Sequence, residues 1–109
     1  MATVPVAAIT RDGVAVTYAT ASGGGDKVKP GSDVFLLVKN GSGSSITVTI
    51  SGVGQTGYGV DNPDKTFTVG AGADKAIPLM PVYGDPNDGG LAAIGWSSAT
   101  SVTFAALRI

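Results

Sequence analysis

The sequence predicts an all-β protein: an antiparallel β-sandwich or small barrel, jelly-roll or immunoglobulin-like, with seven to eight strands. The first observation behind this prediction is that apolar residues recur at period two in short runs, while no useful length has them at helical spacing. The second is that Gly, Pro, Asn and Asp separate these runs at the spacing of antiparallel strands. A chain of 109 residues suits one domain, here 1–109.

The N-terminal third is predicted to hold one strand between two irregular segments. Residues 1–9 are rich in apolar side chains, and their proline opposes a helix, so we hypothesise an extended arm. Val14, Val16 and Tyr18 then share one face of a strand. Residues 21–32, which read ASGGGDKVKPGS, are too polar and too rich in glycine for a core element and predict an exposed loop.

Residues 34–51, VFLLVKNGSGSSITVTIS, are predicted to form a β-hairpin. Two runs, 34–38 and 46–50, flank a polar break in which Asn40-Gly41 supplies the residue types of a tight reversal. The first run is apolar on both faces, which predicts a central strand covered on both sides. The second alternates isoleucine and valine with threonine, which predicts an apolar inner face and a threonine outer face.

The C-terminal half predicts shorter strands joined by turns. Residues 52–65 form a long glycine-rich loop with a turn at Asn62-Pro63-Asp64. Prolines within the run 77–82 place that strand at a sheet edge. The alternating apolar residues predict strands at 67–69, 77–82, 92–96 and 102–106, separated by the breaks GAGAD and YGDPNDGG and by a turn at 97–101.

The composition removes several kinds of chemistry. The chain has no cysteine and no histidine, and all eight acidic residues are aspartate. A disulfide framework, a thiol nucleophile and the commonest general base near neutral pH are therefore impossible. With seven basic residues and a net charge of −1, there is no basic footprint for nucleic acid. We expect no enzyme, no cofactor and no nucleic-acid partner.

The low charge bears on association. Charged residues make up 14% of the chain, against about 25% in ordinary domains. This leaves little repulsion against self-association and favours an outer surface that partners cover, although a lightly charged monomer has the same composition.

Aspartate and asparagine cluster in two loops. Oxygen-rich loops can hold calcium, but neither cluster has the spacing of an EF-hand or its terminal glutamate. Both residue types also make turns by bonding their own backbone, so we predict turns without a bound metal. The two clusters are Asp61, Asn62 and Asp64, and Asp85, Asn87 and Asp88.

The aromatic residues divide into two groups. Trp96 and Tyr18 fall on the apolar faces of predicted strands, so we expect them in the core. Tyr58 and Tyr83 lie in predicted loops and are candidates for contact residues.

Neither end of the chain predicts a membrane association. The opening MATVPVAAITRDG lacks the positive residue that begins a secretory signal. The uncharged stretch 89–107 contains too much glycine, serine and threonine for a transmembrane helix, and two strands around a turn explain it better.

Four segments carry a resemblance to a known group of proteins. They read AAITRDGVAVTYATA, SGGGDKVKPGSDVFLLVKNGSGSSITVTI, FTVGAGADKAIPL and GWSSATSVTFAALRI. Together they resemble small virion proteins of tailed bacteriophages, and head decoration (capsid cement) proteins in particular. The resemblance runs from about residue 8 to residue 109. Its motifs are turns and strands, which convergence can also produce.

The resemblance implies a non-enzymatic protein that binds the outside of an icosahedral capsid and stabilises it. It implies the major capsid protein as partner, a homo-oligomer that can be a trimer, and a virion location after synthesis in the bacterial cytoplasm. A tail or neck component, or a carbohydrate-binding module for host attachment, remains an alternative. The residues hypothesised to contact the capsid come from the N-terminal arm and the two loop tyrosines: Val4, Pro5, Val6, Ile9, Tyr58 and Tyr83.

Overall fold

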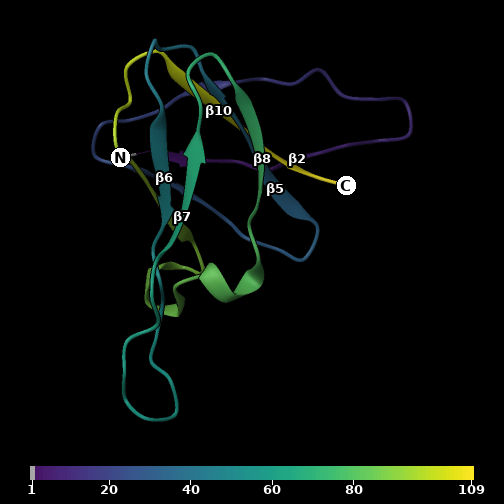
Figure 1. Ribbon diagram of the computed structural model, residues 1–109. Coiled ribbons are helices and arrows are strands. Elements are labelled where there is room, and N and C mark those ends of the chain that lie inside the picture. The colour runs from purple at the N-terminus through teal and green to yellow at the C-terminus, as the bar shows by residue number, and fades with distance from the viewer. Residues whose placement is uncertain (1) are drawn as a thin grey trace.

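The computed structural model describes residues 2–109, which form a β-sandwich of two five-stranded sheets (Figure 1). The sandwich confirms the predicted fold class. In sheet order, sheet A contains β1 (Ala2–Val4), β4 (Asp26–Val28), β9 (Ala92–Trp96), β6 (Ile46–Ile50) and β7 (Lys65–Val69). Sheet B contains β2 (Ala7–Ala8), β10 (Val102–Arg108), β5 (Val34–Asn40) and β8 (Asp74–Pro78), and β3 (Ala19–Thr20) also pairs with β10.

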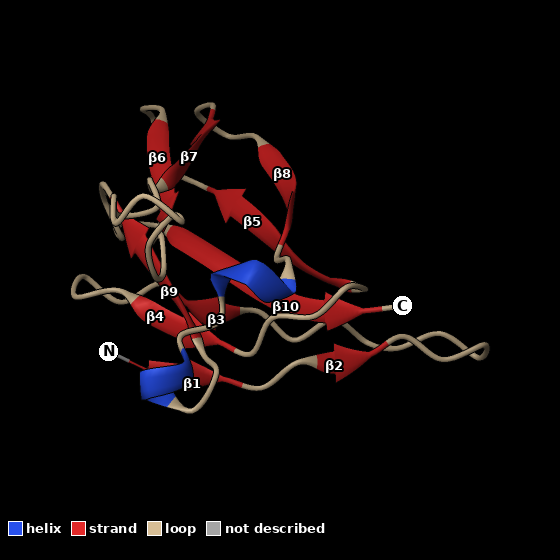
Figure 2. Ribbon diagram, turned by 90° about the horizontal axis from the view of Figure 1, so that it is seen from below, coloured by secondary structure: helices blue, strands red, loops and turns tan. Residues whose placement is uncertain are grey.

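Two short 3-10 turns supply the helical structure of residues 2–109: η1 (Pro81–Tyr83) and η2 (Pro86–Asp88). Figure 2 shows both turns beside the strands, at one end of the sandwich. No helix in the described residues is long and apolar enough to cross a membrane.

The N-terminal segment belongs to both sheets. β1 pairs in parallel with β4 of sheet A, and β2 pairs in parallel with β10 of sheet B. Pro5 and Val6 lie at the crossing between them. The sheets are therefore mixed rather than purely antiparallel. Residues 2–109 contain ten strands rather than seven or eight, because short N-terminal strands add to the predicted ones.

The core lies between the sheets and is built from the inward-facing residues of each strand. On β5 and β6 every second residue is buried, as period two requires. Trp96 packs against this core with its ring centroid 5.0 Å from that of Phe104. Trp96, predicted in the core, is half-buried and lies at the margin of the core.

The predicted hairpin over residues 34–51 is wrong, although both of its strands exist. β5 pairs with β10 and β8 in sheet B, whereas β6 pairs with β7 and β9 in sheet A. The polar break therefore carries the chain from one sheet to the other. The buried side chain of Asn40 holds this crossing, because its Nδ2 donates to the carbonyls of Ser44, Val69 and Gly70. Its Oδ1 accepts from the backbone N–H and the hydroxyl of Ser42.

The predicted strand over residues 14–18 is also wrong. Residues 10–18 form a loop, hereafter the 10–18 loop, which Figure 1 shows extending far from the body. Val14 and Val16 are 40% and 39% exposed. The side of β10 that faces away from β5 is already paired with β2 and β3, so this segment cannot pair with β10 there. Tyr18 is only half-buried and lies outside the core cluster.

The predicted exposed loop at residues 21–32 contains a buried strand. Asp26 and Val28 of β4 are fully buried, and β4 lies between β1 and β9. Asp26 Oδ2 accepts hydrogen bonds of 2.9 Å from Trp96 Nε1 and from the N–H of Ser22. These bonds allow a carboxylate inside the sandwich, which the polar composition did not suggest.

The remaining predicted strands exist, with different bounds. β9 has the predicted range, whereas β7 begins two residues earlier than predicted and β10 ends two residues later. β8 (Asp74–Pro78) overlaps the predicted strand at 77–82 only at residues 77 and 78, and it is an edge strand, as its proline indicated. The predicted strand end at Val82 is different, because Val82 lies in η1 and is exposed.

Candidate contact surfaces

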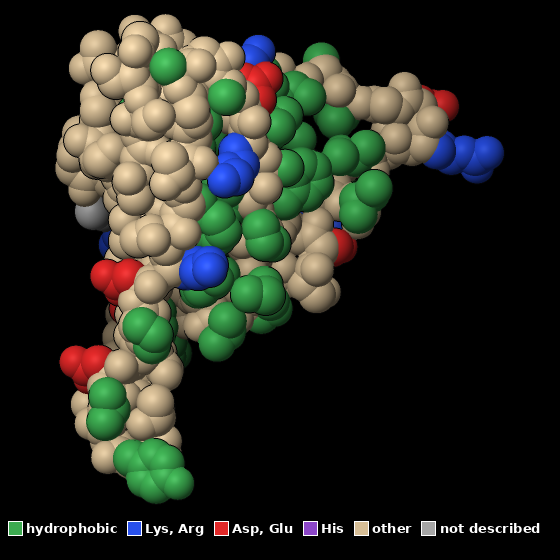
Figure 3. Space-filling model, in the orientation of Figure 1, with side chains coloured by type: hydrophobic (Ala, Val, Ile, Leu, Met, Phe, Trp, Pro, Cys, Tyr) green, Lys and Arg blue, Asp and Glu red, His purple; other side chains and the backbone are tan. Residues whose placement is uncertain are grey.

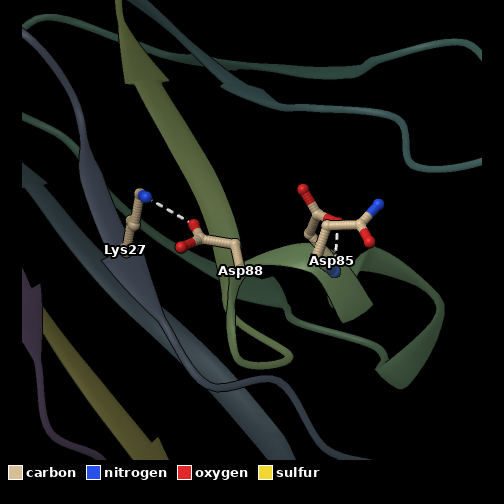
Figure 4. A network of polar contacts seen from close by, with 4 residues as sticks. Lys27, Asp85 and Asp88 are labelled. Carbon is tan, nitrogen blue, oxygen red and sulfur yellow. Dashed lines mark hydrogen bonds and ion pairs between the residues drawn. The ribbon is translucent and has the colours of Figure 1, made fainter.

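The two aspartate clusters shape their own loops, as the sequence predicted. Asp85 caps η2 by accepting from the N–H of Asn87, and Asp88 forms an ion pair with Lys27 of β4 (Figure 4). In the other loop, Asp61 accepts from Gln55 and Asp64 accepts from the N–H of Gly52. No group of three or more carboxylates positioned to hold a metal occurs among the described residues.

The extended arm was hypothesised over residues 1–9; residue 1 lies outside the described residues, and residues 2–9 are paired within the domain. Val4 lies in β1, Val6 packs against the core, and the N–H of Ile9 donates to the carbonyl of Arg108 at 2.8 Å. Pro5 is exposed at the crossing between the sheets. A partner can therefore reach this segment only at its outward side.

Residues 52–64 form an ordered arm between β6 and β7, here named the β6–β7 arm. Backbone bonds from Thr56 to Val60 (2.8 Å) and from Asn62 to Gly54 (3.1 Å) hold its two sides together. The Asp64 carboxylate accepts from Gly52 N–H at 2.7 Å and closes its base. Figure 1 shows the arm projecting below the strands. The sequence predicted a loop here and missed this order.

The two loop tyrosines differ in exposure. Tyr58 is 97% exposed near the end of the β6–β7 arm, and Val60 beside it is 62% exposed. Tyr83 lies in η1, half-buried and packed against the core. The structure therefore presents Tyr58 to a partner much more fully than Tyr83.

The outer faces of the two sheets have opposite character. On sheet A, the outward side chains of β6 and β7 are threonines: Thr47 is opposite Thr68, and Thr49 is opposite Thr66. We call these four residues the threonine face. Thr47 and Thr49 are the predicted threonine side of the strand at 46–50. Thr66 and Thr68 extend this face onto β7.

The outer face of sheet B is apolar over two of its three rows. Register places Leu107, Phe35 and Pro78 in one row, and Ala105, Leu37 and Ala76 in the next. Thr103, Lys39 and Asp74 form a polar third row. We call the six residues of the first two rows the outer apolar face.

The outer apolar face is only partly covered. Ala105 and Leu107 are buried, Phe35 and Leu37 are half-buried, and Ala76 and Pro78 are exposed. Figure 3 shows apolar side chains gathered between the body and the 10–18 loop. The prediction that the strand at 34–38 is central is confirmed, but its second face is not closed over by a further layer of this chain. The sequence signal for the outer apolar face was the run at 34–38, which is apolar on both faces of the strand.

An apolar pocket of about 340 Å³ opens beside β10, on the side where β2 and β3 pair with different parts of this strand. Its lining includes Val4 and Pro5 of the N-terminal segment, Tyr18 of the 10–18 loop, and Ala106 and Leu107 of β10. Lys39 Nζ lies 4.8 Å from the centre of the Tyr18 ring, a cation–π distance. Two of the hypothesised contact residues therefore meet at this pocket.

Comparisons with models of protein families, with curated proteins and with solved structures gave no match to this chain.

Proposed function

We propose that this protein is a structural binding module that covers the outside of an icosahedral bacteriophage capsid and stabilises it. The resemblance of its four segments to phage decoration proteins supplies the identity of the partner, the major capsid protein. The observation that carries the proposal is the contrast between the apolar outer face of sheet B and the threonine face of sheet A.

An exposed apolar sheet face favours a binding partner that removes it from water. Contiguous exposed apolar patches on soluble domains mark binding surfaces, because water contact with them costs free energy. Phe35, Leu37 and Pro78 lie side by side across β5 and β8 and offer such a patch. The strands beneath them are held by backbone pairing, so the patch is presented without a loss of conformational freedom on binding.

The test uses phage particles that lack this chain. Purified protein is added, bound protein is separated by sedimentation, and bound copies are counted. We expect saturable binding, and we expect treated particles to withstand heating that ruptures bare ones. Leu37→Lys places a charge at the centre of the outer apolar face and should weaken binding at least tenfold.

Thr66→Lys is the matched control, because it adds the same charge to the threonine face of sheet A. It should bind as the unmodified chain does. Equal binding by both variants would refute the role of the outer apolar face. Binding confined to tails or necks would instead support the tail-component alternative.

A further inference from the structure

The β6–β7 arm ends in an aromatic side chain that contacts almost nothing in its own molecule. Tyr58 is 97% exposed, whereas aromatic rings contribute most to stability and binding when they are buried. The ladder bonds of the arm hold it out from the body, so the ring is presented on a stiff support. A tyrosine has few rotatable bonds, so fixing it in a complex costs little entropy.

The pocket at the edge of β10 has the size and lining for such a ring. A cavity of about 150 Å³ lined by apolar side chains holds a benzene ring. At about 340 Å³ this pocket has room for a phenol ring and the glycine backbone on each side of it. Two of the lining residues, Thr17 and Tyr18, carry hydroxyl groups, whereas the other lining residues are apolar.

We propose that Tyr58 of one copy enters the β10 pocket of a second copy of this chain. The arm cannot reach this pocket in its own molecule, because it projects away from the body while β2 lies across the body (Figure 1). Tyr58, which the sequence suggested as a capsid contact, is thereby assigned to a contact between copies. Leu107 lines the pocket and also belongs to the outer apolar face, so the contact requires that a partner on that face leave the pocket open.

The arm carries acidic residues, and the surroundings of the pocket carry residues of both signs. Residues 52–64 contain Asp61 and Asp64 and no lysine or arginine. Near the pocket, Lys39 lies close to the Tyr18 ring and is in register with Asp74 of β8. Arg108 follows Leu107 and is exposed, and Asp33 accepts a backbone bond from the next residue, Ile109. Arg11 and Asp12 lie together on the 10–18 loop and offset one another. Lys39 and Arg108 can attract the carboxylates of the arm, although the acidic residues beside them reduce the attraction.

Such a contact is heterologous, since each copy contributes an arm to one neighbour and a pocket to the other. A heterologous contact closes into a ring if the rotation between copies permits, and otherwise builds an open chain. A low net charge of −1 opposes neither outcome.

Sedimentation velocity of the purified chain over a range of concentrations tests the contact. The unmodified chain should associate beyond a monomer, and Tyr58→Phe should do the same. Tyr58→Ser removes the ring, and Thr17→Trp fills the pocket from its exposed rim; each should remain a monomer. Urea unfolding followed by far-UV circular dichroism, which the added tryptophan of Thr17→Trp does not confuse, should show that both variants keep the stability of the unmodified chain.

Mixing the two monomeric variants gives the sharpest result. Tyr58→Ser retains an intact pocket and Thr17→Trp retains an intact arm, so an equimolar mixture should form 1:1 dimers and nothing larger. The double variant lacks both the Tyr58 ring and the open pocket, so it should remain a monomer. A monomeric unmodified chain at millimolar concentration, or unchanged association of Tyr58→Ser, would overturn the proposal. Because no capsid is present, either failure is distinct from a failure of capsid binding.

Discussion

At the scale of single residues, Asp26 is an acidic side chain with a structural role. It is fully buried in β4, and its Oδ2 accepts from the indole N–H of Trp96 and from the backbone of Ser22. Its Oδ1 has no hydrogen-bond partner among residues 2–109. The carboxylate thus ties the loop before β4 to the aromatic residue at the end of β9.

Replacing this carboxylate should destabilise the fold. Asp26→Ala leaves the Trp96 N–H without its acceptor, and hydrogen bonds to charged groups are worth about 1.5–3 kcal/mol. We therefore expect the free energy of unfolding to fall by about 2 kcal/mol. Urea titration followed by Trp96 fluorescence measures it. Asp33→Ala, at an exposed position, is the control and should change stability by less than about 0.5 kcal/mol. A loss no larger than that of the control would contradict this role for Asp26.

Asn40 has a comparable role at the crossing between the sheets. It contacts three carbonyls through its amide and accepts two bonds from Ser42. Asn40→Ala should lower the free energy of unfolding by about 3 kcal/mol, because several buried groups lose partners at about 1 kcal/mol each. Asn87→Ala is the matched control, since the Asn87 side chain is exposed. Similar unfolding midpoints for the two variants in urea would show that the Asn40 bonds are dispensable.

At the scale of elements, the sequence predicted strands better than their partners. The period-two runs at 46–50, 92–96 and 102–106 became strands, because each buries its apolar side in the core. The run at 14–18 has the same alternation and is a loop, since no free strand edge remains beside it. Alternation reports which face a strand can bury, whereas pairing depends on the rest of the chain.

At residues 34–51 the sequence predicted both strands but not the strands with which each of them pairs. Asn40-Gly41 fits a tight hairpin turn, but the same residues also suit a crossing in which the asparagine side chain replaces the hairpin bonds. Burial of Asp26 was similarly hidden, because its hydrogen-bond partner Trp96 is 70 residues away in the sequence. For the candidate site, the sequence identified Tyr58 but could not show the pocket, which distant segments build together.

The base of the β6–β7 arm depends on a glycine. A Cβ at Gly52 would lie 2.2 Å from the carbonyl oxygen of Asn62 and 2.6 Å from that of Pro63, which are backbone atoms. Gly52→Ala should therefore force the two sides of the arm apart. We expect faster hydrogen exchange at the amides of Thr56 and Asn62, which hold the ladder.

Gly57→Ala is the control for this prediction, because a Cβ there has nothing within 4 Å. It should leave the exchange of both amides unchanged. Equal exchange in the two variants would mean that close packing at Gly52 does not hold the arm. Association of the chain should also weaken in Gly52→Ala, since a splayed arm no longer presents Tyr58 in one position.

At the scale of the whole molecule, the two sheets present unlike surfaces to their surroundings. The threonine face of sheet A can remain in water, since its outward side chains are polar. The outer apolar face of sheet B is the side on which a cover gains most free energy, at roughly 25 cal/mol for each Å² of apolar surface buried. In the proposed complex with a capsid, this asymmetry would give the molecule an inner and an outer side.

The orientation on the shell follows from this asymmetry. With the outer apolar face against the capsid, the threonine face points to the solvent. The β6–β7 arm then lies to the side, where a neighbouring copy can receive Tyr58. The capsid contact and the contact between copies would share Leu107, which belongs to the outer apolar face and to the pocket, so both can form together only if the capsid leaves the mouth of the pocket open.

Electron cryomicroscopy of phage particles lacking this chain, after addition of the purified protein, tests the capsid proposal most directly. The expected result is density over the capsid surface, with sheet B facing the shell and sheet A facing the solvent. Density with the threonine face against the shell, or bound only to the tail or neck, would contradict it.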